Sequence, residues 1–434
     1  MFYNPLPLVI FFAGLYFLFK LRFFFVFHPI RTLRLAFDVL KDKRARASLF
    51  LALAGTLGVG NIFGVAVGII IGGAGSVFWI VLSSVFSSAL KYAEVTLTLD
   101  CKETVGYGPA FSGVLKSLGG ASGRSLSAVY TIATLALSLI MGGAMQSGAA
   151  TALCTEYFGV GTLVVSVFFC LLLIFAIIGK RSRISRITEL LIPVATVLYI
   201  LLSACALGVN CEKIPSAVTL IFKEAFTPSA LGGGAVGFLF STALREGFSR
   251  GMLSNEAGAG TSASAHIDSG IEEPGKAGVM GIIEVFFDTT LLCTLTGLVI
   301  LTSVEDLSKH KGGMELVYHA FVGALGNFSG LLLTSVVFVF AYSTVICWYY
   351  YGTRAARGLL GRTGGAVFLP FFLGFCLFGG FIKDGPLIIL TDLAMLVLGV
   401  ICTYTLIKSS DRIKALSERC GLLKSGVSDK TDTG

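Results

Sequence analysis

The sequence predicts an all-α integral membrane protein, and three observations lead to this prediction. Hydrophobic residues make up 55% of the 434 residues and charged residues only 13%, whereas a soluble domain carries about 25% charged residues. The apolar residues form uninterrupted runs of about 20 residues, the length that a helix needs to cross ~30 Å of hydrocarbon. Transmembrane β-strands would be shorter and would alternate in polarity. The basic residues gather between alternate runs.

The long apolar runs predict about eleven transmembrane helices. They lie at residues 5–27, 48–71, 76–99, 126–153, 160–179, 188–209, 233–258, 277–302, 327–352, 364–382 and 385–407. No positive charge precedes the first run, and its basic residues come at its far end. We therefore expect this run to stay in the membrane as a helix and not to be cleaved as a signal peptide.

The distribution of Lys and Arg predicts the orientation of the chain. If the N-terminus faces outward, 28 of the 33 basic residues fall on the cytoplasmic side or in the inner half of the membrane. The five left outside are Lys213, Lys223, Lys309, Lys311 and Lys383. This excess is the positive-inside pattern. We expect a multi-pass plasma-membrane protein with its N-terminus outside and its C-terminus in the cytoplasm. The net charge of +8 thus reflects topology, and nucleic-acid binding has no separate support.

Two glycine-interrupted segments recur five helices apart. The second run contains Gly55-Thr-Leu-Gly-Val-Gly-Asn61, and the seventh contains Gly247-Phe-Ser-Arg-Gly251 followed by Ser254-Asn-Glu-Ala-Gly-Ala-Gly260. Because five is odd, two halves of five helices would have opposite orientations, as in an inverted repeat whose first helices are broken around a midplane site. The alternative for either segment is that its glycines let helices pack closely.

This repeat divides the chain into four parts. Residues 1–47 contain an additional N-terminal transmembrane helix and a basic cytoplasmic loop, and residues 48–209 form the first repeat, with core helices 1–5. Residues 210–407 contain an extracellular loop and the second repeat, with core helices 6–10, and residues 408–434 form a basic cytoplasmic tail. The first and sixth core helices are predicted to be discontinuous.

Enzymatic and metal-dependent functions find little support in the sequence. The ten cysteines include no C-x-x-C pair, the four histidines are scattered without an H-E-x-x-H motif, and no G-K-[ST] motif indicates ATP binding. We expect no cofactor. Ser264 and His266 are close in sequence, which leaves an intramembrane enzyme as an open alternative.

Five segments carry a resemblance to a known family. They are GTLGVGNIFGVAVGIIIGGAGSVFW with KYAEVTLT, RGMLSNEAGAG with a following AH, EVFFDTTLLCTLTGLVIL and FAYSTVICWYYYG, spread over residues 48 to 352. Together they resemble the alanine/glycine:cation symporter family, within the amino-acid–polyamine–organocation class. The resemblance implies ten core helices in a five-plus-five inverted repeat with one additional helix.

The predicted first break offers partners for both charges of an amino-acid zwitterion. Free N–H groups at Gly58, Gly60 and Asn61, at the positive end of a helix dipole, suit a carboxylate. Released carbonyls suit an ammonium group or a sodium ion, and they belong to Ala54, Thr56 and Leu57. The segment Gly58-Val-Gly-Asn61 also resembles the first-helix break of neurotransmitter:sodium symporters, which implies that the Asn61 side chain helps to ligate sodium.

The second break is expected at Gly247 to Gly251, since a half-helix of ~10–14 residues from about Gly237 ends there. Phe248 and Met252 are then expected to line the substrate, with ordinary helix packing as an equal alternative. We assign gating or structural roles to the residues that follow, which are Asn255, Glu256, Gly258 and Gly260.

The remaining candidates lie on other helices. Gln146 matches a family position that faces the cavity. Thr344 and Trp348 are one turn apart, and the resemblance implies that both contact the substrate while Ser343 and Thr344 help to ligate sodium. An ionisable residue inside a membrane helix is costly, so Asp288 is the preferred sodium or gating residue. Glu284 and Glu94 are given gating or structural roles.

The function that we expect is sodium-coupled symport of a small neutral amino acid, alanine or glycine, into the cell by alternating access. The expected partners are this amino acid, sodium and the lipid bilayer, with no obligatory protein partner evident. A proton-coupled permease of the same fold is the alternative, because Asp288 could carry a proton. A channel would instead pass far more than ~10³ ions per second. The choice among alanine, glycine and serine, the stereoselectivity, the stoichiometry and the oligomeric state stay open.

Overall fold

The chain folds into a bundle of helices, with no strand among the residues that a computed structural model describes, which are 5–177, 181–226, 241–310, 312–382 and 384–423. The first part of the chain contains α1 (Leu6–Lys20), α2 (Phe24–Phe27), α3 (Pro29–Val39), α4 (Lys43–Thr56), α5 (Val65–Gly72), α6 (Gly75–Asp100), α7 (Ala110–Ser117), α8 (Gly120–Leu137), α9 (Gln146–Phe158), α10 (Thr162–Ile177) and α11 (Arg181–Val209).

The second part contains α12 (Ile214–Ala225), α14 (Thr242–Asn255), α15 (Ala263–His266), α16 (Pro274–Val285), α17 (Thr294–Ser303), α18 (Gly313–Leu325), α19 (Asn327–Leu360), α20 (Gly364–Phe378), α21 (Asp384–Lys408) and α22 (Ser410–Arg419). Three segments are π-helical: η1 (Gly60–Gly64) leads into α5, η3 (Ser138–Met145) joins α8 to α9, and η5 (Phe286–Cys293) joins α16 to α17.

The long helices confirm a multi-pass membrane protein. Within the described ranges, six helical stretches are long and apolar enough to cross a membrane, and α4 with the helix that follows it, bent by 48°, makes a seventh. The stretch Asn327–Phe381 contains two of the predicted spans, and α1 and α10 are shorter apolar helices. Large apolar side chains lie exposed on α10, where Leu171 and Phe175 are 60% and 66% exposed, as expected for a lipid-facing surface. The count of eleven crossings and the repeat stay predictions.

The first predicted span is shorter than expected. Residues 5–27 do not form one helix, because α1 ends at Lys20 and the backbone of Arg22 and Phe23 is left-handed, with φ of 53° and 50°. The 15 residues of α1 extend only about 22 Å. The apolar run alone overestimated the helix because the left-handed backbone that ends it leaves no mark on the hydropathy.

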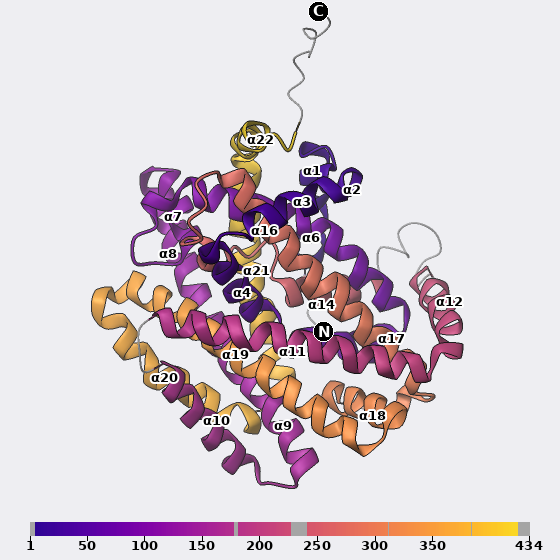
Figure 1. The fold of residues 1–434 in the computed structure, drawn as a ribbon. Coiled ribbons are helices and arrows are strands. Elements are labelled where there is room, and N and C mark those ends of the chain that lie inside the picture. Colours follow the sequence, from indigo (N-terminus) through magenta and orange to yellow (C-terminus); the bar gives the residue numbers. More distant parts are fainter. Residues whose placement is uncertain (1–4, 178–180, 227–240, 311, 383, 424–434) are drawn as a thin grey trace, which may run out of the picture.

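Two groups of helices pack on either side of α11 and α19. In Figure 1, α11 and α19 run across the middle of the molecule, with α10 and α20 on one side and α6, α14 and α16 on the other. The helix α6 packs along both α14 and α16, while α19 packs against α9, α11 and α20. The first break, between α4 and η1, lies where these groups meet, because α19 contacts α4 while α14 contacts η1 and α5.

The second break lies later in the chain than predicted. The helix α14 runs unbroken through Gly247 and Gly251 and ends at Asn255, and the part of the predicted half-helix before residue 241 lies outside the described residues. A Cβ on Gly247 would lie 2.5 Å from the Ser76 carbonyl oxygen, and one on Gly251 would lie 2.1 Å from Ser83 Oγ. These glycines therefore permit close packing against α6, which is the alternative role that small residues have in membrane helices.

The backbone breaks instead at residues 256–262. Glu256, Gly258 and Gly260 have φ of 54°, 83° and 72°, a conformation that ends a right-handed helix. The chain becomes helical again in α15. Gly258 and Gly260 thus make this break, whereas Gly247 and Gly251 allow α14 to pack closely against α6.

Candidate functional site

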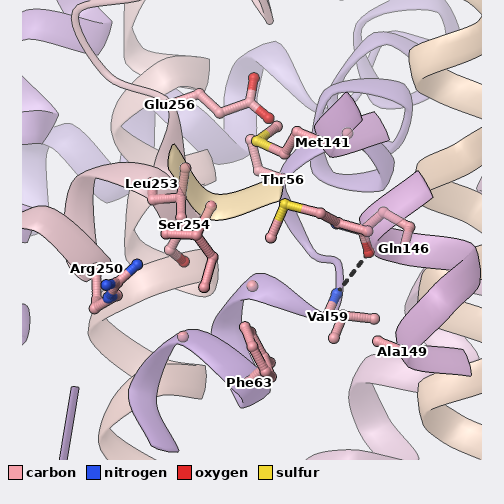
Figure 2. Close-up of a pocket in the computed structure, with 15 residues that line it drawn as sticks. Thr56, Val59, Phe63, Met141, Gln146, Ala149, Arg250, Leu253, Ser254 and Glu256 are labelled. Carbon is pink, nitrogen blue, oxygen red and sulfur yellow. Dashed lines mark hydrogen bonds between the residues drawn. The ribbon is translucent and has the colours of Figure 1, made fainter. Parts of the chain in front are cut away.

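A small cavity lies beside the first break, between α4, η1, η3, α9 and α14 (Figure 2). Its volume is about 50 Å³, far below the ~300–1,000 Å³ of pockets for drug-sized ligands. The lining residues are Gly55, Thr56, Val59, Gly60, Phe63, Gly64, Met141, Met145, Gln146, Ala149, Arg250, Leu253, Ser254, Glu256 and Ile388. The cavity therefore joins residues from both predicted repeats.

The first break is held from the side by Gln146. The N–H of Val59 donates to Gln146 Oε1 at 2.9 Å, as Figure 2 shows, while the N–H of Gly58 turns back to the Thr56 carbonyl at 2.7 Å. A Cβ on Gly58 would lie 2.8 Å from both Gln146 Oε1 and Thr344 Oγ1, so glycine is needed for this close approach. Gly60 and Asn61 lie in the first turn after the break, where N–H groups lack intrahelical partners.

Thr344 and Trp348 bind the backbone of the break from α19 and do not line the cavity. Thr344 Oγ1 lies 3.4 Å from the Leu57 carbonyl, and Trp348 Nε1 donates to the Gly55 carbonyl at 3.3 Å. Gly142 lies directly against the indole, because a Cβ there would be 2.3 Å from Trp348 Cβ. The structure thus places both side chains behind the break, where they satisfy carbonyls that the break releases.

The predicted sodium ligands fall into two places. Ser343 Oγ is buried and has no hydrogen-bond partner among the described residues, so this hydroxyl remains free to accept an ion. Ala54 and Leu57 are buried on α4 and at its end, and Thr56 lines the cavity. The second place is formed by Asn61 and Asp288, which the sequence had placed more than two hundred residues apart.

Asp288 and Asn61 form a buried polar cluster with hydroxyl groups. Asn61 Nδ2 donates to Asp288 Oδ1 at 2.6 Å, and Ser254 Oγ and Thr289 Oγ1 donate to Asp288 Oδ2 at 2.8 and 2.7 Å. All four side chains are at most 4% exposed, and Asn61 Oδ1 has no hydrogen-bond partner in the part of the chain that is described. A helix beside each break and the π-helical segment η5 thus converge on one carboxylate.

Phe248 and Met252 do not reach the cavity, in contrast to the prediction. The Phe248 ring packs against Phe11, Trp79 and Phe86, with ring centroids 5.5, 6.0 and 5.8 Å apart. Met252 lines a separate small cavity beside α1 and α21. The prediction failed because it put the break at Gly247 to Gly251. With the break after Asn255, a different face of α14 points to the cavity.

That face carries Arg250 and Ser254, which line the cavity, and Glu246 lies one helical turn before Arg250. Arg250 Nη2 donates to Glu246 Oε2 at 3.1 Å, while Arg250 Nε is buried without a hydrogen-bond partner among the residues described. Arg250, Glu246 and Ser254 were not predicted as site residues. For Glu246 and Arg250, the presence of two charged residues four positions apart in a membrane helix was the signal that could have identified them.

The second break is anchored by the residues assigned gating or structural roles. The N–H of Gly258 donates to Glu94 Oε1, and Thr261 Oγ1 donates to Glu256 Oε2 at 2.5 Å. Asn255 accepts the N–H of Ala257 at 3.0 Å and donates to Thr289 Oγ1 at 2.9 Å. A Cβ on Gly260 would lie 2.8 Å from the Phe111 ring, so this position also needs glycine.

Glu94 and Glu284 share a buried lysine. Lys91 Nζ lies 3.8 Å from Glu94 Oε2 and 3.7 Å from Glu284 Oε1, and it donates to Ser262 Oγ at 3.0 Å. His266 Nε2 lies 3.2 Å from Glu284 Oε2. The Lys91 and Glu94 pair on α6 thus extends to α16 and to the second break.

The similarity of the whole chain identifies its family. Residues 1–418 match the profile of the Sodium:alanine symporter family. The chain belongs to this family. Among its relatives, it is 30% identical to the "Sodium/alanine symporter AgcS" of Methanococcus maripaludis over 81% of this chain and 80% of the relative. It is 28% identical to the "Probable sodium/glutamine symporter GlnT" of Bacillus subtilis over 82% of this chain and 74% of that protein.

Solved structures show the same fold. A "Crystal structure of MhsT in complex with L-phenylalanine" has a TM-score of 0.63 and 14% identity, covering 88% of this chain and 92% of that chain. A manganese transporter of Eremococcus coleocola has a TM-score of 0.53, also with 14% identity, covering 86% and 76%. This member of the sodium:alanine symporter family therefore has a transporter fold.

Membership in a symporter family makes the chain a transporter and not an enzyme. The structure gives Ser264 and His266 other contacts. Ser264 Oγ accepts the N–H of Ala110 at 3.0 Å, and His266 contacts Glu284. Ser264 and His266, which had kept an intramembrane enzyme as an alternative, thus take part in the packing around α15.

Proposed function

We propose that this chain carries a small neutral amino acid, alanine or glycine, into the cell together with sodium ions. The observation that carries this proposal is the cluster around Asp288, in which oxygen atoms from both halves of the chain are buried beside the cavity. Hard cations in proteins take several oxygen ligands, and in broken-helix transporters the ion lies next to the breaks. Both relatives named as sodium symporters support sodium as the coupled ion, and AgcS supports alanine as the substrate.

The cavity also suits a zwitterion. Its lining includes the guanidinium of Arg250 and the carboxyl group of Glu256, which Figure 2 shows at different ends of the lining. A substrate with one carboxylate and one ammonium group can contact a group of opposite charge at each end. The other lining side chains are mostly apolar, and Met141, Met145 and Phe63 leave room for only a small side chain.

Sodium is favoured over a proton because the cluster is rich in neutral oxygens. Asp288 accepts hydrogen bonds from Ser254 and Thr289, whose hydroxyl groups can turn their lone pairs to a metal ion. Asn61 Oδ1 is unpaired there, and no cationic side chain among the described residues lies within ion-pair distance of Asp288. A buried carboxylate is costly without a compensating cation, and a proton alone would not need the surrounding oxygens.

The test measures which gradient drives uptake. The purified protein in liposomes should accumulate labelled alanine under an inward sodium gradient, and an inward proton gradient without sodium should give little accumulation. Asp288→Asn should weaken the sodium dependence. The matched control is Asp38→Asn, because the Asp38 side chain is 64% exposed on α3 and pairs with nearby Lys41; this change should leave uptake unaltered.

Two results would contradict the proposal. Accumulation from the proton gradient alone would replace sodium by protons as the driving ion. Unlabelled glycine and serine should compete with alanine, and leucine and glutamine should not. Stronger competition by glutamine than by alanine would assign a larger substrate.

A further inference from the structure

Three side chains with metal-ligating atoms meet on the connection between α17 and α18. His310 follows the short 3₁₀ turn Leu307–Lys309, and Glu315 and His319 lie one turn apart on α18. One ligand atom of each residue lies within 4.8 Å of those of the other two. His310 Nδ1 is 3.4 Å from Glu315 Oε1, and the two imidazole rings are 5.2 Å apart between centroids. The scattered sequence positions of the histidines gave no sign of this grouping.

Two imidazole nitrogens and one carboxylate oxygen form a set that zinc prefers. Zinc binds His and Glu in tetrahedral sites at about 2.0–2.2 Å, and sites with three protein ligands keep a fourth position for water. At these bond lengths, ligand atoms lie roughly 3.3–3.5 Å apart. The His310 and Glu315 atoms already have this separation, and the remaining pairs need a movement of only roughly 1–1.5 Å, which a side-chain rotation can supply.

The surroundings leave these ligands available. The Glu315 side chain is 47% exposed and His319 is exposed, so an ion can enter and keep a bound water. Lys309, the neighbour that could neutralise Glu315, lies 3.5 Å from Asp306 instead. The i, i+4 spacing of Glu315 and His319 places both on one face of a helix, which holds two of the three ligands on a rigid element.

We propose that His310, Glu315 and His319 form a zinc-binding site. The site is separate from the cavity and from the sodium cluster, and it does not depend on the proposed substrate. It lies at the start of α18, whose Gly313 lies against η1 and α5, because a Cβ there would be 2.9 Å from Phe63 Cδ2 and Val67 Cγ2. Zinc bound here fixes the connection to α18 beside the helix that carries the cavity residue Phe63.

The test measures zinc binding to the full-length protein in lipid nanodiscs by calorimetry with zinc chloride. We expect one zinc ion per chain and at least a tenfold increase in Kd for His319→Ala and for Glu315→Gln. His28→Ala is the matched control, because His28 is exposed on another part of the chain, and it should bind zinc as the unaltered protein does. Cobalt chloride should give the visible absorption of a tetrahedral site only when all three ligands are present.

The proposal fails if the unaltered protein binds zinc no more tightly than the double variant His310→Ala with His319→Ala. It also fails if cobalt gives the same spectrum in both. Since Glu315 and His319 are exposed, His319→Ala and Glu315→Gln should melt at the same temperature as the unaltered protein without zinc, and zinc should raise the melting temperature of the unaltered protein alone.

Discussion

Arg250 is a charged residue within a membrane helix, where a charge is energetically unfavourable, and its presence there indicates a function. Its side chain is only 8% exposed, and in a membrane helix such a residue faces the protein interior or a water-filled cavity. The contact with Glu246 uses Nη2 and leaves Nε without a partner among the described residues. A free donor in the lining of the cavity suits the carboxylate of an amino acid.

Replacement of Arg250 should therefore weaken substrate binding. Hydrogen bonds to charged groups contribute about 1.5–3 kcal/mol, so Arg250→Met should raise the apparent KM for alanine by about tenfold to a hundredfold. Arg250→Lys keeps the charge but has no second nitrogen in a fixed fork, and it should restore this KM only in part. Transport assays in liposomes at saturating sodium give these values.

The matched control is Arg245→Gln. Arg245 also lies near Glu246, at 3.6 Å, but its side chain is 33% exposed and it does not line the cavity. An unchanged KM in Arg250→Met, or the same increase in both variants, would mean that Arg250 acts only through the packing of α14.

Single residues could be predicted from the sequence where their type is unusual in its surroundings. Asp288 stood out because an acid inside an apolar run is rare, and Asn61 stood out beside two glycines. Ser254 could not be identified in this way, since a serine in a membrane helix usually bonds to its own backbone. Its donation to Asp288 depends on how α14 and η5 are rotated relative to each other, and no local pattern encodes that rotation.

At the scale of elements, the two breaks differed in how well they could be predicted. The first break was predicted within the segment from Gly55 to Asn61, and the structure has it between Thr56 and Gly60. Two glycine pairs, Gly247 with Gly251 and Gly258 with Gly260, lie in and just after the seventh run, and the sequence alone does not say which pair makes a turn and which allows close helix packing. The three π-helical segments had no sequence signal either, although η3 leads into Gln146 and η5 contains Asp288, and such segments often lie at functional sites.

The second break depends on the buried charges around Lys91, and this dependence can be measured. Lys91→Met leaves Glu94 and Glu284 without their shared cation, and the loss of one partner of a buried pair costs about 3–5 kcal/mol. We expect a clearly lower melting temperature. The double variant Lys91→Met with Glu284→Gln should regain part of the loss, because it removes one of the two uncompensated carboxylates.

An exposed pair provides the control for this experiment. Lys276 and Glu273 lie 2.7 Å apart, but their side chains are 37% and 50% exposed. Lys276→Met should change stability by less than about 1 kcal/mol. If Lys91→Met melts like Lys276→Met, the buried charges do not hold the second break.

At the scale of the whole molecule, contacts between distant segments agree with the predicted sidedness. Lys20 Nζ lies 2.5 Å from Asp411 Oδ1, and Arg412 pairs with Asp100, so three segments predicted to be cytoplasmic meet at one end. At the other end, Asn210 Nδ2 donates to Ser303 Oγ at 3.2 Å. These contacts show which segments share a side, and the excess of Lys and Arg at the first end favours that end as the cytoplasmic one.

The cysteines of the chain provide a direct test of this orientation. Seven of the ten are buried, Cys420 is partly buried, and Cys205 and Cys211 are exposed. Cys211 follows α11 on the side predicted to be outside.

In a background with Cys205→Ala and Cys420→Ala, a membrane-impermeant maleimide should label Cys211 on intact cells, and Cys211→Ser should abolish this labelling. Adding Ala415→Cys, on the exposed face of α22, should give a second label only after the membrane is made permeable. Labelling of position 415 on intact cells, with Cys211 protected, would mean that the orientation is the opposite of the predicted one. Because the structure puts the zinc ligands on the same side as Ser303, external zinc would then be unable to reach its site.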